Sequence, residues 1–157
     1  MADEKKTTGE TMSAELAEQE IARWAEDNDI DIVGAGFSDT DKLALTMTKE
    51  RLVKSMQRGF LSINDKGNFV YTVSQKSPAG FAGTSVEIVP PNGRAYMGID
   101  NYKTQQMNHK IVAICSAMTG KDIGWFSNLY NTDYKVFTGI AQIARSEERR
   151  VGKECRS

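Results

Sequence analysis

The chain is poor in the residues that most catalytic and metal sites need, with one histidine, two cysteines and three prolines among 157 residues. A zinc site or a histidine-assisted nucleophile needs partners that a single histidine does not have. His109 lies in the polar stretch QQMNHK and is expected at the surface. No apolar run approaches the roughly 20 residues of a membrane-spanning helix, and no basic-then-apolar leader is present. The net charge of −1 gives little electrostatic reason to expect nucleic acid or an anionic membrane as a partner.

The C-terminal residues Arg145–Ser157 (RSEERRVGKECRS) are similar to the conceptual translation of a sequencing adapter and follow an apolar helical pattern abruptly. We therefore leave them out of the fold prediction, and the alternative is a genuine basic tail. Without their five basic and three acidic side chains the net charge is −3, and Cys115 is the remaining thiol. A lone thiol cannot form an intrachain disulfide, which fits a reducing compartment. Its place on an apolar helical stripe predicts that it is buried and inert.

The N-terminal part is predicted to be an arm followed by a helix. Residues 1–12 are polar and lack apolar periodicity, so we expect a disordered arm. Ser13 can cap a helix that ends near Glu26, with one narrow apolar stripe formed by Ala17, Ile21 and Trp24. Because the stripe is narrow, this helix is expected on the surface or docked onto another element. Residues 13–41 are thus predicted to be an N-terminal helix and a glycine-containing linker.

The next segment is predicted to combine a strand and a helix. Lys42–Thr48 (KLALTMT) alternates between apolar and other residues, which is typical of a strand. Thr48 can then cap a helix, KERLVKSMQRG, that ends at Gly59. The inward positions of this helix are Leu52, Val53 and Met56.

Further strands are predicted on both sides of a loop. FLSI and NFVYTV, joined by Asn64–Gly67, form a hairpin pattern, because the glycine allows the positive φ that such turns need. Ser74–Gly83 is predicted to be a loop. Thr84–Val89 alternates again and is stopped by two prolines.

From about residue 95 the apolar period changes from two to about 3.6. One helix can start at Asp100 or Asn101 and end at Gly120, Asp122 caps a short segment, and a last helix starts at Asn131 or Thr132. The apolar face of the first helix contains Met107, Ile111, Ile114, Cys115 and Met118. The sequence therefore predicts an α+β fold: a small, mainly antiparallel sheet with one crossing helix, followed by a three-helix C-terminal half. Residues 42–144 form the predicted domain, β-rich over 42–91 and helical over 95–144.

The stretch IDIVGAGFSDTDKLALT has some features of a dinucleotide-binding turn, but its third glycine position holds Asp39. A carboxylate there repels an anionic ligand by about 4 kcal/mol at about 4 Å and an effective dielectric near 20. The segment that follows also alternates like a strand where the motif needs a helix. A nucleotide-binding enzyme is therefore a distant alternative, and Gly34 and Gly36 are predicted to form a flexible joint.

Other catalytic and metal-binding patterns are incomplete. Asp27–Asp31 (DNDID) spaces three carboxylates like a calcium loop, but Ile32 and Ser38 occupy the positions of the required glycine and bidentate acid. Ser116 and Ser127 have no neighbouring histidine in the sequence. We therefore predict no catalytic, cofactor-binding or metal-binding residues, and no cofactor.

Aromatic residues gather in the helical half. Core positions are predicted at Phe126, Leu129, Phe137 and Ile140, because a domain must bury most of its large apolar residues. The remaining aromatics and methionines suit an adaptable protein-binding face. The predicted partner-binding residues are Met97, Met107, Trp125, Tyr130 and Tyr134.

Three segments carry a resemblance to a known family: LTMTKERLVKSMQRGFLSINDKGNFVYTV, SVEIVPPNGRAYMGID and HKIVAICSAMTGKDIGWFSNLYNTDYKVFTGIAQI. Their order of elements, with Thr119-Gly120 closing one apolar helix and Asp133 near the start of the last, resembles the tail assembly chaperones of long-tailed bacteriophages. The likeness covers about two-thirds of the chain and is one of element pattern.

This resemblance implies a non-enzymatic protein of the infected bacterial cytoplasm that is absent from the mature virion. It implies binding to the phage tape-measure protein and recruitment of the tail-tube protein, and it leaves homo-oligomer formation open. The alternative from a different class is a structural component of the virion, such as a minor tail or connector subunit.

Overall fold

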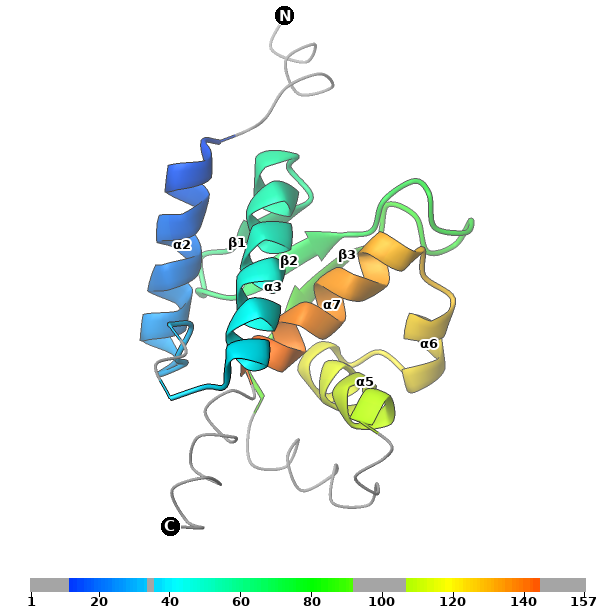
Figure 1. The fold of residues 1–157 in the computed structure, drawn as a ribbon. Coiled ribbons are helices and arrows are strands. Elements are labelled where there is room, and N and C mark those ends of the chain that lie inside the picture. The colour runs from blue at the N-terminus through cyan, green and yellow to red at the C-terminus, as the bar shows by residue number, and fades with distance from the viewer. Residues whose placement is uncertain (1–11, 34–35, 92–106, 145–157) are drawn as a thin grey trace, which may run out of the picture.

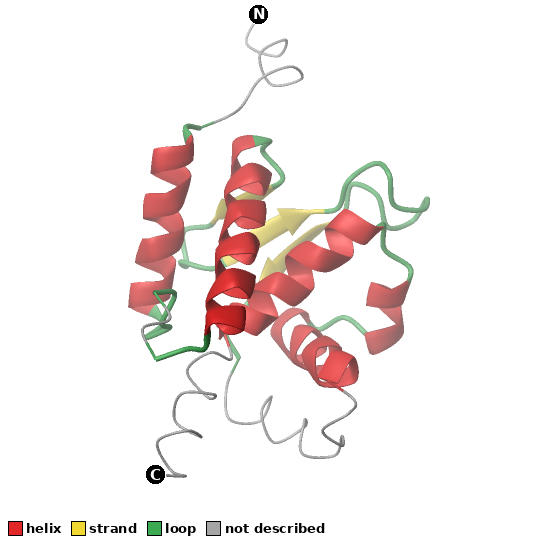
Figure 2. Cartoon of the chain, viewed as in Figure 1, coloured by secondary structure: helices red, strands yellow, loops and turns green. Residues whose placement is uncertain are grey.

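The computed structural model describes residues 12–33, 36–91 and 107–144. Within these residues two helices come first, then a three-stranded sheet, then three more helices, which confirms the α+β prediction (Figure 1). The helices lie on one side of the sheet (Figure 2). The core is a single cluster of buried side chains that draws on the helices before the sheet, the sheet itself and the helices after it.

The sheet consists of β1 (Leu61–Ile63), β2 (Phe69–Thr72) and β3 (Ser85–Ile88), antiparallel and in that order. The predicted hairpin and the strand after the loop are thus confirmed. The register places alternate residues of the three strands on one face. This face is buried beneath the helices and consists of Leu61, Phe69, Tyr71, Val86 and Ile88.

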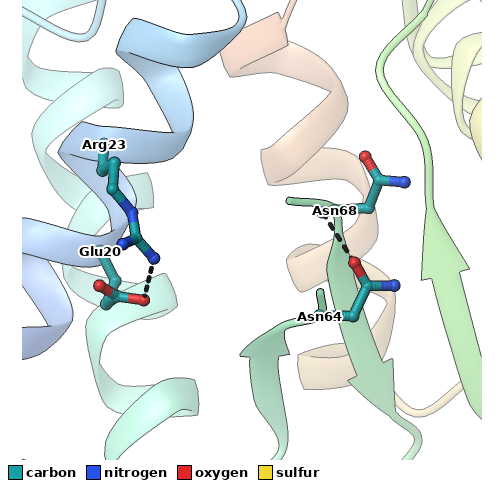
Figure 3. Close-up of polar contacts among 4 residues, drawn as sticks. All are labelled: Glu20, Arg23, Asn64 and Asn68. Carbon is teal, nitrogen blue, oxygen red and sulfur yellow. Dashed lines mark hydrogen bonds and ion pairs between the residues drawn. The ribbon is translucent and has the colours of Figure 1, made fainter. Parts of the chain in front are cut away.

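The β1–β2 turn is held by the side chain of Asn64, whose Oδ1 accepts hydrogen bonds from the backbone N–H groups of Lys66 and Asn68 (Figure 3). The side-chain amides of Asn64 and Asn68 also donate to Glu87 of β3, at 2.8 and 2.9 Å. These hydrogen bonds, that of Asn68 first, lower the pKa of Glu87 below its usual value. The turn is therefore fixed to the far strand of the sheet.

Helix α2 (Ala14–Asp27) begins as predicted, with Ser13 Oγ accepting a hydrogen bond from the N–H of Leu16. Its predicted stripe is buried, and the Trp24 ring lies 4.5 Å from the Phe69 ring of β2, centroid to centroid. The helix is docked onto the sheet and contributes to the same core. The Trp24 Nε1–H is buried without a hydrogen-bond partner among the described residues.

Helix α3 (Asp39–Gln57) runs through the segment predicted to be a strand, so the strand prediction for Lys42–Thr48 was wrong. The Ser38 side chain accepts a hydrogen bond from the N–H of Asp41 and caps the helix. Two aspartates in the first turn are also favourable at the positive end of the helix dipole. Thr48 is therefore an interior residue of this helix, and its predicted role as a cap was wrong.

The burial of α3 follows a helical period. Its buried residues recur at intervals of three and four: Leu45, Thr48, Leu52, Ser55 and Met56. Of the alternating residues that indicated a strand, Leu45 is buried, whereas Leu43 and Met47 are 61% and 52% exposed. The predicted end at Gly59 is confirmed: its N–H bonds to the Met56 carbonyl with φ of 84°, and the Phe60 N–H bonds to the Ser55 carbonyl.

The C-terminal half contains α5 (Met107–Thr119), α6 (Ile123–Ser127) and α7 (Asn131–Ala144), as predicted. Asp122 precedes α6, but the prediction that its side chain caps this helix was wrong: the side chain makes no capping bond, and the Asp122 carbonyl accepts from the Trp125 N–H instead. The start predicted at Asp100 or Asn101 lies outside the described residues. The predicted inward residues of α5 are buried: Ile111, Ile114, Cys115 and Met118.

Helices α3 and α7 approach closely at Gly139. A Cβ atom at this position would lie 2.9 Å from Cγ2 of Thr48, which is closer than side chains normally approach. Gly139 thus lets the two helices pack across the sheet, and Thr48 is buried for this reason.

The predicted boundary between residues 41 and 42 falls inside α3 and was wrong. The start of the segment 42–91, predicted to be β-rich, is helical instead. Gly34 of the predicted joint lies outside the described residues, as do most of the 1–12 arm and all of Arg145–Ser157. In the part of the chain that the structure describes, no helix is long and apolar enough to cross a membrane.

Candidate functional site

Three features of the described residues could support a function: a buried aspartate, an aromatic cluster around α6, and an open groove between α2 and α3. No group of histidine, cysteine, aspartate and glutamate side chains in the described ranges has the arrangement of a metal site. His109 is exposed on α5, as predicted.

The buried carboxylate is that of Asp133, in the first turn of α7. Its Oδ1 accepts hydrogen bonds from the Tyr71 hydroxyl at 2.6 Å and the Ser74 N–H at 3.1 Å. Its Oδ2 accepts from the hydroxyls of Ser74 at 2.9 Å and Ser77 at 2.6 Å. Ser77 Oγ in turn accepts the N–H of Tyr130 at 2.8 Å. The network joins β2, the predicted loop Ser74–Gly83 and the start of α7.

This network has the properties of a structural connection. Asp133 is fully buried, and each of its oxygens accepts two hydrogen bonds, so its acceptor capacity is used. The pKa of Tyr71 is raised, first by burial and then by the hydrogen bond to Asp133 and the charge of Asp133. The phenol therefore keeps its proton and acts as a hydrogen-bond donor. The two serine hydroxyls face the carboxylate and have no histidine beside them. The arrangement therefore positions α7 against the sheet.

The aromatic cluster is centred on Trp125. Its ring lies within 6 Å of three other rings, those of Phe81, Phe126 and Phe137, at 5.7, 5.2 and 5.8 Å. The Lys121 ammonium lies 5.3 Å from the Trp125 ring centroid on its outer side. Phe126 and Phe137 are buried as predicted, as are Leu129 and Ile140.

The predicted partner-binding residues differ in their exposure to solvent. Trp125 and Tyr134 are half-buried, and Tyr130 is exposed, with the Lys76 ammonium 5.4 Å from its ring. Met97 lies outside the described residues, as does the side chain of Met107. Their role in binding a partner stays a prediction.

The thiol of Cys115 is buried against α7, as predicted. It donates a long hydrogen bond, 3.4 Å, to the Phe137 carbonyl, and burial raises its pKa to about 12. The pKa of Tyr134 is also raised, first by burial and then by the negative charge that Cys115 carries as a thiolate. Since the thiolate is the reactive form, Cys115 is unsuited to act as a nucleophile at neutral pH.

An open groove of about 620 Å³ lies between α2 and α3. The two helices run antiparallel (Figure 1), so the first turns of α2 face the last turns of α3. Apolar side chains of both helices and of the segment between them line it: Ile21, Ile32 and Val53. The small, exposed side chains of Ala14, Ala22 and Thr46 also line it.

Charged groups surround this apolar lining. Glu18 lies on the α2 side, and Lys49, Glu50 and Lys54 lie on the α3 side. The Lys49 ammonium donates to the Ile32 carbonyl at 3.3 Å, which fixes the chain between the helices. Among the described residues, no ion pair joins the two walls; the ion pair formed by Arg23 is with Glu20, along α2 (Figure 3). The groove thus combines an apolar floor with charged rims, as partner-binding sites commonly do.

The sequence prediction missed this groove because the start of its α3 wall, at Thr46, was assigned to a strand. A helix from Asp39 puts Thr46, Lys49, Val53 and Gln57 on one side, at intervals of three and four. The available signal was Ser38 followed by two aspartates, which is a helix start.

Comparisons of the chain with known protein families, with characterised proteins and with solved structures give no match.

Proposed function

We propose that this chain is a non-catalytic, protein-binding assembly factor that acts as a phage tail assembly chaperone. In this proposal it binds apolar helical segments of the tape-measure protein and assists assembly of the tail tube. The observation that carries the proposal is the open groove between α2 and α3, with its apolar floor at Ile21, Ile32 and Val53. The resemblance in the order of elements provides the identity of the partner.

The shape of the groove suits a helix. Both walls are helices, and their lining residues recur every three or four positions, so a third helix can place its side chains between them. The α3 wall from Thr46 to Gln57 corresponds to about 16 Å at 1.5 Å per residue. A bound segment of about three turns therefore fills it. This is the helix-in-groove mode of recognition.

The energy of such a contact is sufficient. Each large apolar side chain that becomes fully buried contributes about 1.5–3 kcal/mol. Micromolar binding corresponds to about 8 kcal/mol, so three to five anchoring side chains from the partner suffice before ordering costs. Leu43 and Met47 extend the apolar surface along α3, because they precede Glu50 and Lys54 on the same helical stripe. A chaperone needs this adaptable contact and no bond-making chemistry.

The proposal predicts that a tape-measure protein is encoded beside this gene, and co-expression of the two proteins tests it. We expect a soluble complex that survives size-exclusion chromatography, while the tape-measure protein alone aggregates. Ala22→Trp fills the groove from an exposed position and should abolish the complex. Ala117→Trp is the matched control, since Ala117 is exposed on α5.

Two results would contradict the proposal. One is failure of the wild-type chain to keep the tape-measure protein soluble. The other is a complex that tolerates Ala22→Trp as well as it tolerates Ala117→Trp, since binding would then use another surface. Circular dichroism of each variant shows that the fold is retained.

A further inference from the structure

The two rims of the groove differ in charge. The outer stripe of α2 consists of exposed residues at positions i, i+3, i+7 and i+11, and three of the four are acidic: Glu15, Glu18, Ala22 and Glu26. The one basic residue of α2, Arg23, lies off this stripe and pairs with Glu20 at 2.8 Å (Figure 3). No basic side chain of α2 therefore compensates the acidic rim.

The outer stripe of α3 is different. It begins with two exposed apolar residues and continues with one acidic and one basic residue: Leu43, Met47, Glu50 and Lys54. Because the helices are antiparallel, the Glu18 end of α2 faces the Lys54 end of α3, and both residues line the groove. The α2 rim thus carries three acidic side chains and no basic one, and the α3 rim is apolar at one end and mixed at the other.

We propose that the groove selects an amphipathic helix of the partner protein whose apolar stripe has a basic flank, and that this flank lies along α2. This inference rests on the proposed function and adds the chemistry and orientation of the bound segment. Lysine or arginine side chains spaced at i, i+3 or i+4 and i+11 on the partner meet Glu15, Glu18 and Glu26 in turn. The opposite flank of the bound helix lies along α3, and the end of α3 that contains Leu43 and Met47 offers it an apolar surface.

Electrostatic complementarity of this kind sets specificity and orientation more than total affinity. The rim charges are exposed, so each pair contributes modestly and is screened by salt. The apolar floor at Ile21 and Val53 holds any helix of suitable size, whereas the acidic rim discriminates between helices. Two such pairs together should change the dissociation constant about tenfold.

The test uses two fluorescent, helix-stapled peptides of about 18 residues with the same leucine stripe. One has lysine and the other glutamate at the positions that flank the stripe on one side. Fluorescence anisotropy at low salt should give about tenfold tighter binding of the lysine peptide, and the preference should shrink as salt rises. In Glu18→Lys/Glu26→Lys the preference should reverse.

The matched control is Glu20→Lys/Asp27→Lys, which makes the same change of charge on the same helix but off the rim. It should keep the preference of the wild type. Equal affinity of the wild-type chain for both peptides overturns the inference, as does an equal effect of the control pair.

The remaining outcomes separate this inference from the function on which it rests. If tape-measure segments bind in an Ala22→Trp-sensitive manner but neither peptide is preferred, the function stands and the basic flank is wrong. If neither the peptides nor tape-measure segments bind, both fail. Concentration-dependent self-association that Ala22→Trp abolishes would make a second copy of this chain the occupant and overturn the inference.

Discussion

Replacing Asp133 by alanine should be among the most destabilising single changes in this fold. The substitution removes a fully buried carboxylate that accepts four hydrogen bonds from three residues, Tyr71, Ser74 and Ser77. Each hydrogen bond to a charged group contributes about 1.5–3 kcal/mol, and donors left buried without an acceptor cost about 1–3 kcal/mol each. Relief from burying a charge offsets several kcal/mol of this sum.

The expected net loss is about 3–5 kcal/mol in the free energy of unfolding, because breaking a buried hydrogen-bond network is one of the few mechanisms by which a single substitution costs this much. With a urea dependence of about 1.5 kcal/mol per molar, the midpoint should fall by about 2–3 M. Asp133→Asn keeps the carbonyl oxygen for Tyr71 and the Ser74 N–H, and its amide can donate to a serine hydroxyl. Its loss should be smaller, about 1–2 kcal/mol.

Urea unfolding followed by circular dichroism measures these losses. The matched control is Asp122→Ala, because Asp122 also lies at the start of a helix but is exposed and makes no side-chain cap. It should cost less than about 0.5 kcal/mol. A loss below about 1 kcal/mol for Asp133→Ala, or one equal to that of Asp122→Ala, would refute the view that this network fixes α7 to the sheet.

Three further predictions concern packing and pH. Gly139→Ala places a Cβ 2.9 Å from Thr48 Cγ2 and should cost about 1–3 kcal/mol in the free energy of unfolding. Thr48→Ser removes that methyl group, so the double variant should recover most of the loss. If the losses of the two single variants simply add in urea denaturation, the α3–α7 contact is contradicted. Trp24→Ala removes a buried ring packed against Phe69 and should cost about 3–5 kcal/mol in thermal or urea unfolding; a loss near zero would mean that α2 is not part of the domain. The pKa of Glu87 is lowered from its usual value of 4.5, so its hydrogen bonds to Asn68 and Asn64 stabilise the fold above that pH and stop doing so as the pH falls through the lowered pKa. Glu87→Gln should therefore lose less stability between pH 7 and pH 3.5 than the wild type does, and identical pH profiles of the two urea midpoints would contradict this.

Local patterns in the sequence were sufficient to predict those elements whose apolar period and whose start or end residues indicate the same structure. Ser13 is a helix start followed by an apolar stripe, and Gly59 is a helix end; both are as predicted. The hairpin followed from two β-rich runs on either side of a turn with Gly67. In each case residues within one element determine its geometry.

The prediction for the N-terminal half of α3 was wrong because a window of a few residues cannot distinguish the strand period of two from the helical period of 3.6. Leu43, Leu45 and Met47 alternate over a few residues, but only Leu45 faces the core. The helical period becomes clear when the window extends to Leu52 and Met56, beyond the presumed boundary at Thr48. Two exposed apolar residues on a surface helix produced the false alternation.

The tertiary features lay beyond any local pattern. Asp133 bonds to Ser74 and Ser77, which are 59 and 56 positions away, so no spacing in the sequence connects them. The groove likewise needs the antiparallel pairing of α2 with α3, which no local pattern in either helix predicts. The predicted surface at Trp125 depended on isolated stripes, whereas Phe81 and Lys121 cover part of that ring.

The central claim is that the groove between α2 and α3 binds a helix of another protein. Hydrogen–deuterium exchange of the chain, alone and with a tape-measure segment, tests it most directly. We expect added protection in α2 and in α3 around Val53, and none around α6. Protection confined to Trp125, Tyr130 and their neighbours, with α2 and α3 unchanged, would contradict the account.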